Sequence, residues 1–589
     1  MGAVREMLFI PSVRKGDGIG HLRRCLDFSQ RAPNGALLLP KDDSGERRLR
    51  EVARASGIDL PEERLIREEE SAARRWELVL LDRRTTTVEE LDRFRKLGPV
   101  AAIDEGGAAR PFVPYLLDTL PLPRGASGAN IASSCFLTRP INRRPKGAPP
   151  TGRVLVSFGG EDPGALSAKT ARALIKEGIA PACALTIVVG PLFRPEDYPK
   201  GARILVSPPS LRELLHEYDL VVTSFGLTAY ESVAAGAEVL IVNPTRYHRR
   251  LAKIAGFPDV GLGSPNRRRL RRASADHERQ KALRGRIGAT RELSVVDHFD
   301  GLDFSAPTLC PVCGSSRNPA VARFIDRSFF RCQACTMIYE VDFLGRRTEY
   351  GQRYFEEEYR AHYGKSYLED FENIRAVSRG RLDCIAGCGI RLSGARLLDV
   401  GCAYGPFLAA SADRGVAPAG LDVAAPAVDF VTTTLGFEAR CMRFEDLDET
   451  GFRPNGSLDL LTMWYVIEHF PELDSVLKRV NRLLRMGGLF AFSTPNANGV
   501  SGRRTPARFL EKSPRDHFTI WTPRIARRVL ARYGFRVRRI RVTGHHPERF
   551  SWGASARGAA RALIDRYSRV CGLGDTFECY AVKVAEAER

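Results

Sequence analysis

The sequence predicts an α/β protein made of two or three domains, and three observations support this. The chain has 589 residues, too many for one hydrophobic core. Its 43% hydrophobic and 27% charged residues are typical of an ordinary folded, soluble protein. Short apolar runs alternate with helix-compatible segments along most of the chain, which is the pattern of parallel α/β architecture.

The first 300 residues contain strand candidates on both sides of a proline-containing connection, Asn142–Thr151. We therefore expect an α/β lobe at residues 1–145, a second α/β lobe at residues 146–300, and a cleft between them. The candidate strands are Met7–Ile10, Leu78–Leu81, Val100–Ile103, Val154–Ser157, Leu185–Val189, Arg203–Val206, Leu220–Thr223 and Glu238–Val242.

Three small-residue loops in this region each follow a candidate strand. The first is Gly16-Asp-Gly18-Ile-Gly20-His21, where glycines allow a ligand to approach the backbone and a helix N-terminus favours an anion. His21 stands at the expected edge of the cleft. The others are Ser157-Phe-Gly159-Gly160-Glu-Asp162-Pro163, and Ser224-Phe-Gly226-Leu-Thr228-Ala-Tyr-Glu231, in which Glu231 can reach ribose hydroxyls.

These loops, together with the strand end Asp104-Glu105-Gly106, resemble those of the nucleotide-sugar hydrolases of pseudaminic acid biosynthesis, relatives of the glycosyltransferase-B fold. The resemblance covers residues 1–263. It implies a two-lobed glycosyltransferase-B-like region that removes UDP from a sugar. His21 would be the catalytic base or water-orienting group. The nucleotide-sugar-binding residues would be Gly18, Gly20, Gly159, Gly160, Thr228 and Glu231.

Two C-x-x-C pairs follow, Cys310–Cys313 and Cys332–Cys335, separated by 18 residues. This spacing predicts a four-cysteine zinc ribbon over residues 305–345, with Phe329, Phe330 and Tyr339 as its small apolar core. All four ligand positions are filled, so the zinc would be structural.

Residues 346–589 form the last predicted domain. The aromatic residues of Gln352–Asn373 recur at nearly helical spacing, which favours a helix that packs on the domain or a cap whose tyrosines line a pocket. The run Arg396-Leu-Leu-Asp399-Val-Gly401-Cys-Ala403-Tyr-Gly405 then predicts a buried strand, a tight loop and a helix N-terminus. Asp422, at the end of the next strand, is placed to accept hydrogen bonds from both hydroxyls of a ribose.

Later motifs indicate the family that this predicted domain resembles. Residues 457–469, Leu483-Leu-Arg-Met-Gly-Gly488 and Tyr533-Gly-Phe-Arg-Val537 resemble, in order, class I S-adenosylmethionine-dependent methyltransferases. The resemblance implies a Rossmann-like domain that binds S-adenosylmethionine, and Ala403 replaces the family's usual middle glycine. His469 lies where the family places a catalytic base; the alternative is a structural histidine at a helix start. The cofactor-binding candidates are Asp399, Gly401, Gly405, Asp422, Phe444 and Glu445.

Composition limits the other function classes. The net charge is +20, but arginines are spread through the whole chain and mixed with acids, which favours solvated surfaces over a nucleic-acid partner. We see no transmembrane run and no signal peptide, so we expect a cytoplasmic protein without membrane insertion. The cysteines outside the ribbon are scattered among apolar neighbours, which is typical of reduced thiols.

The sequence thus predicts a bifunctional enzyme that hydrolyses a UDP-activated amino sugar and methylates a sugar or related small molecule in surface-glycan biosynthesis. Three alternatives remain open at this point. The N-terminal region can be a glycosyltransferase, or a non-catalytic UDP-sugar binding module, because hydrolysis and transfer share one fold. The C-terminal region can be an RNA methyltransferase. The oligomeric state is not predicted.

Overall fold

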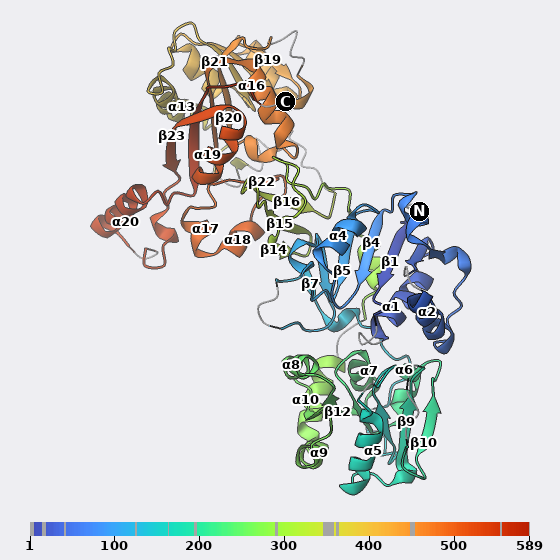
Figure 1. Cartoon of the computed structure of the whole chain (residues 1–589). Coiled ribbons are helices and arrows are strands. Elements are labelled where there is room, and N and C mark those ends of the chain that lie inside the picture. The colour runs from blue at the N-terminus through green and yellow to red at the C-terminus, as the bar shows by residue number, and fades with distance from the viewer. Residues whose placement is uncertain are drawn as a thin grey trace. The chain divides into compact units, whose positions relative to one another are not determined.

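The computed structural model describes residues 5–14, 19–39, 43–123, 127–145, 147–162, 164–191, 193, 197–288, 292–345, 359–360, 364–447, 454–553 and 556–587. The chain divides into two compact units, which we describe separately (Figure 1). The first comprises residues 1–306 and 323–327, and the second comprises residues 307–322 and 328–589. Among the described residues, no helix is both long and apolar enough to cross a membrane.

The first unit begins with a seven-stranded, wholly parallel sheet of order β3-β2-β1-β4-β5-β6-β7. Its strands are β1 (Met7–Pro11), β2 (Gly35–Leu38), β3 (Leu65–Ile66), β4 (Leu78–Asp82), β5 (Val100–Ile103), β6 (Tyr115–Asp118) and β7 (Ile131–Ala132). Helices α1 (Gly20–Arg31), α2 (Asp43–Ala55), α3 (Glu68–Ala72) and α4 (Val88–Arg95) connect them.

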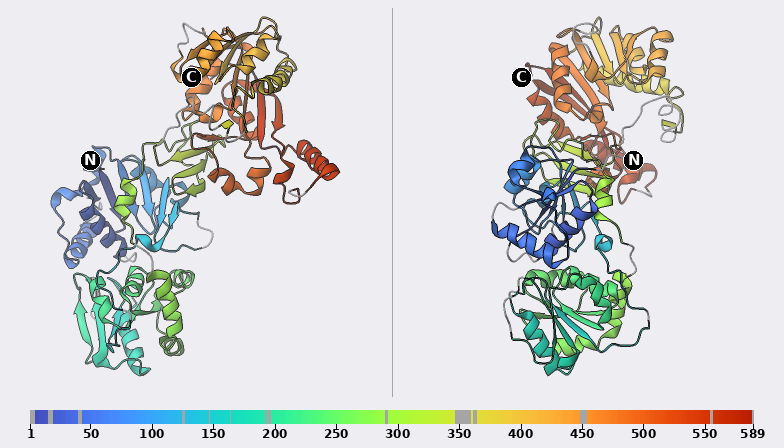
Figure 2. Two further views of the ribbon diagram at one scale, coloured as in Figure 1. Left: turned by 180° about the vertical axis from the view of Figure 1, so that it is seen from behind. Right: turned by 90° about the vertical axis from the view of Figure 1, so that its right-hand side faces the viewer.

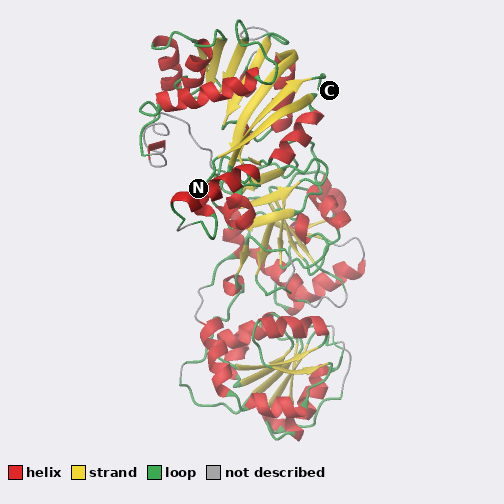
Figure 3. Cartoon of the chain, turned by 90° about the vertical axis from the view of Figure 1, so that its left-hand side faces the viewer, coloured by secondary structure: helices red, strands yellow, loops and turns green. Residues whose placement is uncertain are grey.

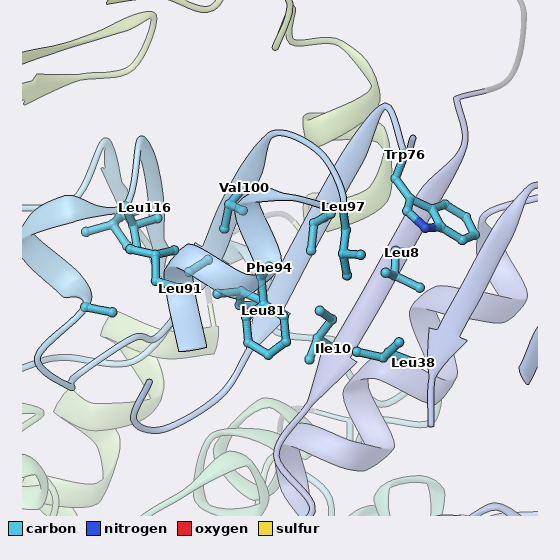
Figure 4. Close-up of a cluster of buried hydrophobic side chains, with 14 of the residues drawn as sticks. Leu8, Ile10, Leu38, Trp76, Leu81, Leu91, Phe94, Leu97, Val100 and Leu116 are labelled. Carbon is cyan, nitrogen blue, oxygen red and sulfur yellow. The ribbon is translucent and has the colours of Figure 1, made fainter. Parts of the chain in front are cut away.

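The core of this sheet is formed by apolar side chains of the central strands and of α4. Leu8 and Ile10 of β1 and Leu81 of β4 are at most 3% exposed, and Leu91 and Phe94 of α4 belong to the same buried cluster (Figure 4). Burial of the strands on both faces explains why they read as continuous apolar runs in the sequence.

The second sheet of this unit has six parallel strands in the order β10-β9-β8-β11-β12-β13. They are β8 (Val154–Ser157), β9 (Leu185–Val189), β10 (Arg203–Val206), β11 (Leu220–Thr223), β12 (Glu238–Asn243) and β13 (Asp259–Leu262). Helices lie on both sides of the strands (Figure 3): α5 (Leu166–Lys176), α6 (Leu211–Leu214), α7 (Leu227–Ala235), α8 (Arg246–Ile254), α9 (Arg267–Ser274) and α10 (His277–Gly288).

Helix α11 (Val295–Asp300) returns to the first sheet. The ring of Phe299 lies 5.7 Å from that of Tyr115 on β6, and His298 is hydrogen-bonded to the Tyr115 hydroxyl at 2.9 Å. From the sequence we expect the residues of α11 to belong to the second lobe. In the structure, α11 packs on the first sheet instead, because its apolar face is buried there.

The second unit opens with a small sheet of order β14-β15-β16-β22, from β14 (Ala320–Phe324), β15 (Arg327–Arg331), β16 (Ile338–Asp342) and β22 (Thr519–Ile520). Phe329, Phe330 and Tyr339 are all at most 3% exposed, as predicted. β22 comes from far along the chain and pairs antiparallel with β16, through Ile338↔Ile520 and Tyr339↔Thr519.

The large sheet of this unit has the order β19-β18-β17-β20-β21-β24-β23, in which β24 is antiparallel to its neighbours. Figure 2 shows this sheet in yellow to red. Its strands are β17 (Arg396–Val400), β18 (Ala417–Asp422), β19 (Glu438–Cys441), β20 (Leu458–Trp464), β21 (Leu484–Pro495), β23 (Phe535–Thr543) and β24 (Thr576–Lys583). The helices are α13 (Phe371–Ala386), α14 (Pro406–Ala412), α15 (Ala425–Thr433), α16 (Leu473–Leu483), α17 (Val500–Arg504), α18 (Pro506–Glu511), α19 (Pro523–Arg532) and α20 (Gly558–Val570).

All eight strands proposed for the first 300 residues are present, most within one residue of the expected ends. Only part of the segment Gln352–Asn373 is described. Residues 359–360 are helical, residues 364–370 form turns and bends, and α13 begins at Phe371. The Tyr367 ring lies 6.0 Å from the Tyr404 ring and the Phe371 ring lies 6.4 Å from the Phe430 ring, so these aromatic side chains pack on the domain. Tyr354, Phe355 and Tyr363 lie outside the described residues.

Candidate functional site

Each of the three large sheets has a point where the strand order reverses direction. These points lie between β1 and β4, between β8 and β11, and between β17 and β20. Ligands of open α/β sheets bind beside the carboxyl ends of the strands at such a point. The predicted site loops follow β1, β8, β11, β17 and β20, so the topology places them at these positions.

In the second unit, the loop 401–405 connects β17 to α14. Gly401, Ala403 and Gly405 have φ of 73°, 48° and 77°, all in the left-handed region. A Cβ at position 401 would lie 2.4 Å from Val466 Cγ2, so only glycine allows the two loops at the switch point to approach this closely. Ala403 adopts the same backbone region at a cost of about 1 kcal/mol.

Asp422 ends β18 beside this loop, as predicted. One carboxylate oxygen accepts the Ala403 N–H at 2.8 Å, and the other accepts the Ala424 N–H at 2.9 Å. Each oxygen retains a second lone pair, so the group can still accept ribose hydroxyls. Burial raises the pKa of Asp422, and these backbone hydrogen bonds counteract part of that shift. Asp422 therefore holds the backbone of the loop that follows β17.

Asp399 on β17 is only 1% exposed. Its Oδ1 accepts a hydrogen bond from Thr462 Oγ1 on β20 at 2.5 Å. Burial raises the pKa of this carboxyl to about 7, with the hydrogen bond from Thr462 opposing the shift. The side chain thus lies inside the sheet at the strand end and joins β17 to β20 directly beneath the glycine loop.

Phe444 and Glu445 lie on a 3-10 turn, Phe444–Asp446. The Phe444 ring is 2% exposed and packs 6.2 Å from the Phe470 ring, while Arg479 Nη1 donates to the Phe444 carbonyl at 3.1 Å. The sequence predicts that Phe444 flanks an adenine, but the ring faces the protein interior. Glu445 pairs with Arg443 at 3.0 Å.

His469 follows β20 on the turn Ile467–His469. Its Nδ1 donates to the Asp516 main-chain oxygen at 3.0 Å, and the Asp516 carboxylate lies 3.3 Å away. Although burial opposes protonation, the hydrogen bond to Asp516 and the charge of Glu468 raise the pKa of His469 above its ordinary value. The Nδ1 contact with Asp516 thus fixes the orientation of the imidazole.

Two further side chains gather at His469. The His517 ring lies 4.7 Å from the His469 ring, nearly perpendicular to it. Glu468 is 1% exposed, and among the described residues neither of its carboxylate oxygens has a hydrogen-bond partner. Burial raises the pKa of Glu468 to about 7. Glu468, His469 and His517 present ligand atoms within 4.8 Å of one another, so this cluster could hold a cation.

The strand pairing of β16 with β22 brings the Asp516–His517 segment to this place. The Glu340 N–H on β16 donates to the Phe518 carbonyl at 2.9 Å, one residue beyond His517. The cysteine knuckles adjoin the same unit, since Asp474 N–H donates to the Pro311 carbonyl at 2.8 Å and Tyr533 donates its hydroxyl to the Val312 carbonyl at 2.8 Å.

Cys310, Cys313, Cys332 and Cys335 converge as the sequence predicts, with their Sγ atoms within 4.8 Å of one another. Cys310 Sγ lies 3.4 Å from Cys335 Sγ, and Cys313 Sγ lies 3.4 Å from Cys332 Sγ. A tetrahedral site with zinc–sulfur bonds of about 2.3 Å has sulfur–sulfur edges of about 3.8 Å. The four thiols therefore fit a tetrahedral metal ion after a small expansion.

In the first unit, His21 lies in the first turn of α1, which Gly20 begins. Its Nδ1 lies 2.6 Å from Oδ1 of Asp82, the last residue of β4. Gly18 lies outside the described residues. Asp104 follows β5, as the motif Asp104-Glu105-Gly106 predicts. Its carboxylate accepts hydrogen bonds from the Thr119 backbone N–H and hydroxyl, both at 2.6 Å, and thereby connects the ends of β5 and β6.

At the second switch point, Gly159 has φ of 75° and a Cβ on Gly160 would lie 2.6 Å from Ile19. The sequence predicts an anion at the N-terminus of α5. The Asp162 carboxylate already accepts the Leu166 and Ser167 N–H groups there, both at 2.8 Å. A short acidic side chain inside the loop thus takes the donors that a phosphate would use.

Thr228 and Glu231 lie one turn apart on α7. Glu231 lies 3.9 Å from Arg212 and, with Arg23 and Thr138, lines a small cavity. Burial raises the pKa of Glu231, and the nearby Arg23 and Arg212 oppose that rise. The carboxylate therefore faces a polar cavity instead of bulk solvent.

The large sheet of the second unit, with its glycine loop, strand-end acids and His469, has the features of a nucleotide-binding α/β domain. Residues 373–540 match the family model described as "Methyltransferase domain". By this match, residues 373–540 are a methyltransferase domain, and the sheet that carries it has a Rossmann-like strand order.

The chain is similar to the ubiquinone biosynthesis O-methyltransferase of Xanthomonas oryzae pv. oryzae (strain PXO99A), with 31% identity over 139 residues, 23% of this chain and 54% of the relative. It is similar to the enzyme of that name from Neisseria meningitidis serogroup A, with 32% identity over 139 residues, 22% of this chain and 57% of the relative. The chain thus spans about half the length of these curated relatives.

Among solved structures, a SAM-dependent methyltransferase from Archaeoglobus fulgidus matches with a TM-score of 0.28 and 18% identity, covering 37% of this chain and 100% of that chain. The geranyl diphosphate C-methyltransferase from Streptomyces coelicolor A3(2) matches with a TM-score of 0.26 and 16% identity, covering 35% of this chain and 76% of that chain.

Sequence reasoning did not assign roles to several residues of these sites. Glu468 directly precedes His469 and follows a buried strand, and this position in the sequence could have indicated it as a site residue. His517 and Asp82 carried none, because the strand pairs β16·β22 and β1·β4 that bring them to the sites are long-range contacts.

Proposed function

We propose that the chain is a methyltransferase that transfers the methyl group of S-adenosylmethionine to a hydroxyl of a sugar or related small molecule. The observation that supports this best is the third switch point, where the glycine loop 401–405 and Asp422 lie on one side, and His469 with Glu468 lie on the other. In this proposal, a donor site and a proton acceptor would share the carboxyl end of the sheet.

The residues present fit the donor. Gly401 is required by the close contact with Val466, and Gly401, Ala403 and Gly405 all have left-handed backbone conformations. Asp422 and the amides of the loop would hold the nucleoside, and Asp399 would stiffen the strand end beneath it. When bound, S-adenosylmethionine supplies an electrophilic methyl group on a positively charged sulfur.

The chain's own residues would position the acceptor and take its proton. His469 is held by Asp516 and would accept a proton from an attacking hydroxyl, a role that contributes on the order of 10²–10⁴-fold. Glu468 would provide a second polar group for the acceptor. The curated relatives are named O-methyltransferases, which favours an oxygen acceptor over a carbon acceptor.

We propose a structural zinc ion at the four cysteines. All four ligands come from the protein, so no position is left open for catalysis. In a module this small, the metal supplies most of the folding free energy. The zinc would thereby hold β16 in place, and through it β22 and the Asp516–His517 segment.

For the first unit we propose hydrolysis of a UDP-activated amino sugar, which would make the chain bifunctional in surface-glycan biosynthesis. Water would attack the anomeric carbon, the bond to the diphosphate oxygen would break with its electron pair leaving on UDP, and His21 would accept the water proton. Gly159, Gly160, Thr228 and Glu231 would hold the nucleotide. The position of His21 at the switch point supports this role.

Calorimetry of the full chain with S-adenosylhomocysteine and with UDP tests both sites, and binding of neither would refute the proposal. Mass spectrometry of a substrate pool incubated with labelled methyl donor identifies the acceptor. UDP release in water supports the hydrolase, release only with an added sugar acceptor indicates a glycosyltransferase, and binding without release indicates a binding module. RNA binding that falls steeply with salt would indicate an RNA methyltransferase instead.

A further inference from the structure

His21 belongs to a buried charged network at the carboxyl ends of three strands. Asp82 is the last residue of β4, and Asp104 and Thr119 directly follow β5 and β6. The Asp82 side chain has no exposed surface, whereas the His21 side chain is 15% exposed. The network therefore runs from the interior of the sheet to an imidazole at the surface of the switch point between β1 and β4.

Arg24, one turn beyond His21 on α1, holds Asp82 in a fixed orientation. Its Nε donates to Oδ2 and its Nη2 donates to Oδ1, both at 2.6 Å. Nη2 also lies 2.8 Å from Oδ2 of Asp104, and Nη1 donates to the Thr119 hydroxyl at 2.8 Å. A planar guanidinium clamped by two carboxylates and a hydroxyl leaves Asp82 little rotational freedom.

The charge state of Asp82 follows from the same contacts. Burial alone would raise its pKa, but Arg24 and His21 hold the pKa of Asp82 below its usual range. An ionised carboxylate can only accept hydrogen bonds. The 2.6 Å contact to His21 Nδ1 is then one in which the imidazole donates, so its other nitrogen, Nε2, carries no proton in the neutral ring.

We propose that Asp82 is a positioning residue which, clamped by Arg24, fixes His21 in the Nδ1–H tautomer and presents Nε2 as a proton acceptor at the switch point of the first sheet. This inference deepens the proposed hydrolase function and rests on it for its role in catalysis. The geometry itself is independent of the substrate, so it can be tested without one.

The chain offers a matched control. Asp118, the last residue of β6, is also buried and forms a bidentate pair with Arg110, at 2.9 and 2.7 Å, but has no recorded contact with His21. Asp118→Asn and Asp82→Asn therefore each weaken one buried arginine–carboxylate pair in the same sheet. Only the second variant alters the imidazole's partner.

The experiment measures the tautomer of His21 in the full-length chain by long-range ¹H–¹⁵N correlation with ¹⁵N-labelled histidine. The chain has 10 histidines, and the signal lost in His21→Gln identifies the ring. We expect the Nδ1–H form in the wild type and in Asp118→Asn. In Asp82→Asn, whose amide can also donate, we expect a shift toward the Nε2–H form. An Nε2–H ring in the wild type, or no change in Asp82→Asn, would overturn the inference.

Turnover provides a second readout. If the wild type releases UDP from a UDP-sugar, Asp82→Asn should lower kcat by on the order of 10²–10⁴-fold with little change in KM, while Asp118→Asn retains activity. A fall of similar size in both variants would indicate a merely structural role and overturn the inference. If the wild type has no such activity, the hydrolase proposal fails, and the tautomer measurement still decides the placement of Asp82.

Discussion

Asp399 gives the most quantitative test of the second unit. Its carboxyl is buried in the sheet with one hydrogen bond, from Thr462, and burial raises its pKa to about 7. In the unfolded chain an aspartate titrates near 3.9. The folded state therefore favours the protonated form. The corresponding stability is fully present below about pH 4 and is lost as the pH rises toward 7 and above.

The size of the effect follows from the two pKa values. At about 1.36 kcal/mol per pKa unit, the loss amounts to about 1.5 kcal/mol at pH 5 and about 4 kcal/mol at pH 8. Asp399→Asn removes this pH dependence, and it also changes the free energy of unfolding by an amount that does not depend on pH. The stability change caused by the substitution should thus become more favourable by about 2.5 kcal/mol between pH 5 and pH 8.

Hydrogen exchange of peptides that cover β17 and β20 reports this locally, without interference from the first unit. The control is Asp429→Asn, because Asp429 is exposed on α15. We expect slower exchange in Asp399→Asn at pH 8 than at pH 5, relative to the wild type at each pH, and no such difference in the control. If the stability difference between Asp399→Asn and the wild type changed by less than about 0.5 kcal/mol between pH 5 and pH 8, the raised pKa of Asp399 would be refuted.

Four further predictions concern the sites. The His469→Gln variant should keep its affinity for S-adenosylhomocysteine but lose on the order of 10²–10⁴-fold in the rate of methyl transfer. Wild-type activity should rise with pH through the raised pKa of His469, because only the neutral ring accepts a proton. Activity that falls over this pH range would contradict the role. Ala403→Gly should increase stability toward urea by about 0.5–1 kcal/mol, since glycine relieves the left-handed strain at that position, and a destabilised variant would show that the strain is absent. Cys335→Ser should lower the zinc content measured by mass spectrometry and speed hydrogen exchange at residues 516–520, and unchanged exchange there would separate the cysteine cluster from the active-site segment. Glu231→Gln should weaken UDP binding by about tenfold in calorimetry, roughly one charge-assisted hydrogen bond, whereas equal affinity would remove Glu231 from the nucleotide site.

The elements predicted best were those set by local patterns. Runs such as Leu78–Leu81 and Leu220–Thr223 are buried on both faces, so their apolar character is continuous and marks a strand without any knowledge of its neighbours. The glycine loop after β17 was predicted for a similar reason, because a left-handed backbone conformation limits which residues can occupy a position. Strands β2, β6 and β24 were not predicted, since short or late runs give a weaker signal.

The spacing of the cysteines and the residue types of a loop are properties of neighbouring residues. The sequence by itself therefore determined the four-cysteine cluster and the glycine loop at 401–405, and it indicated His21 and His469 as candidate site residues. Only the tertiary structure decided what surrounds them. In the folded chain, Asp82 is hydrogen-bonded to both His21 and Arg24, and the Phe444 ring is buried. The Asp162 carboxylate accepts the N–H groups at the N-terminus of α5. His517 lies beside His469 because strand β22 pairs with β16. These outcomes depend on contacts between segments far apart in the chain, and such contacts form only when strands pair and pack, a process that no local pattern encodes.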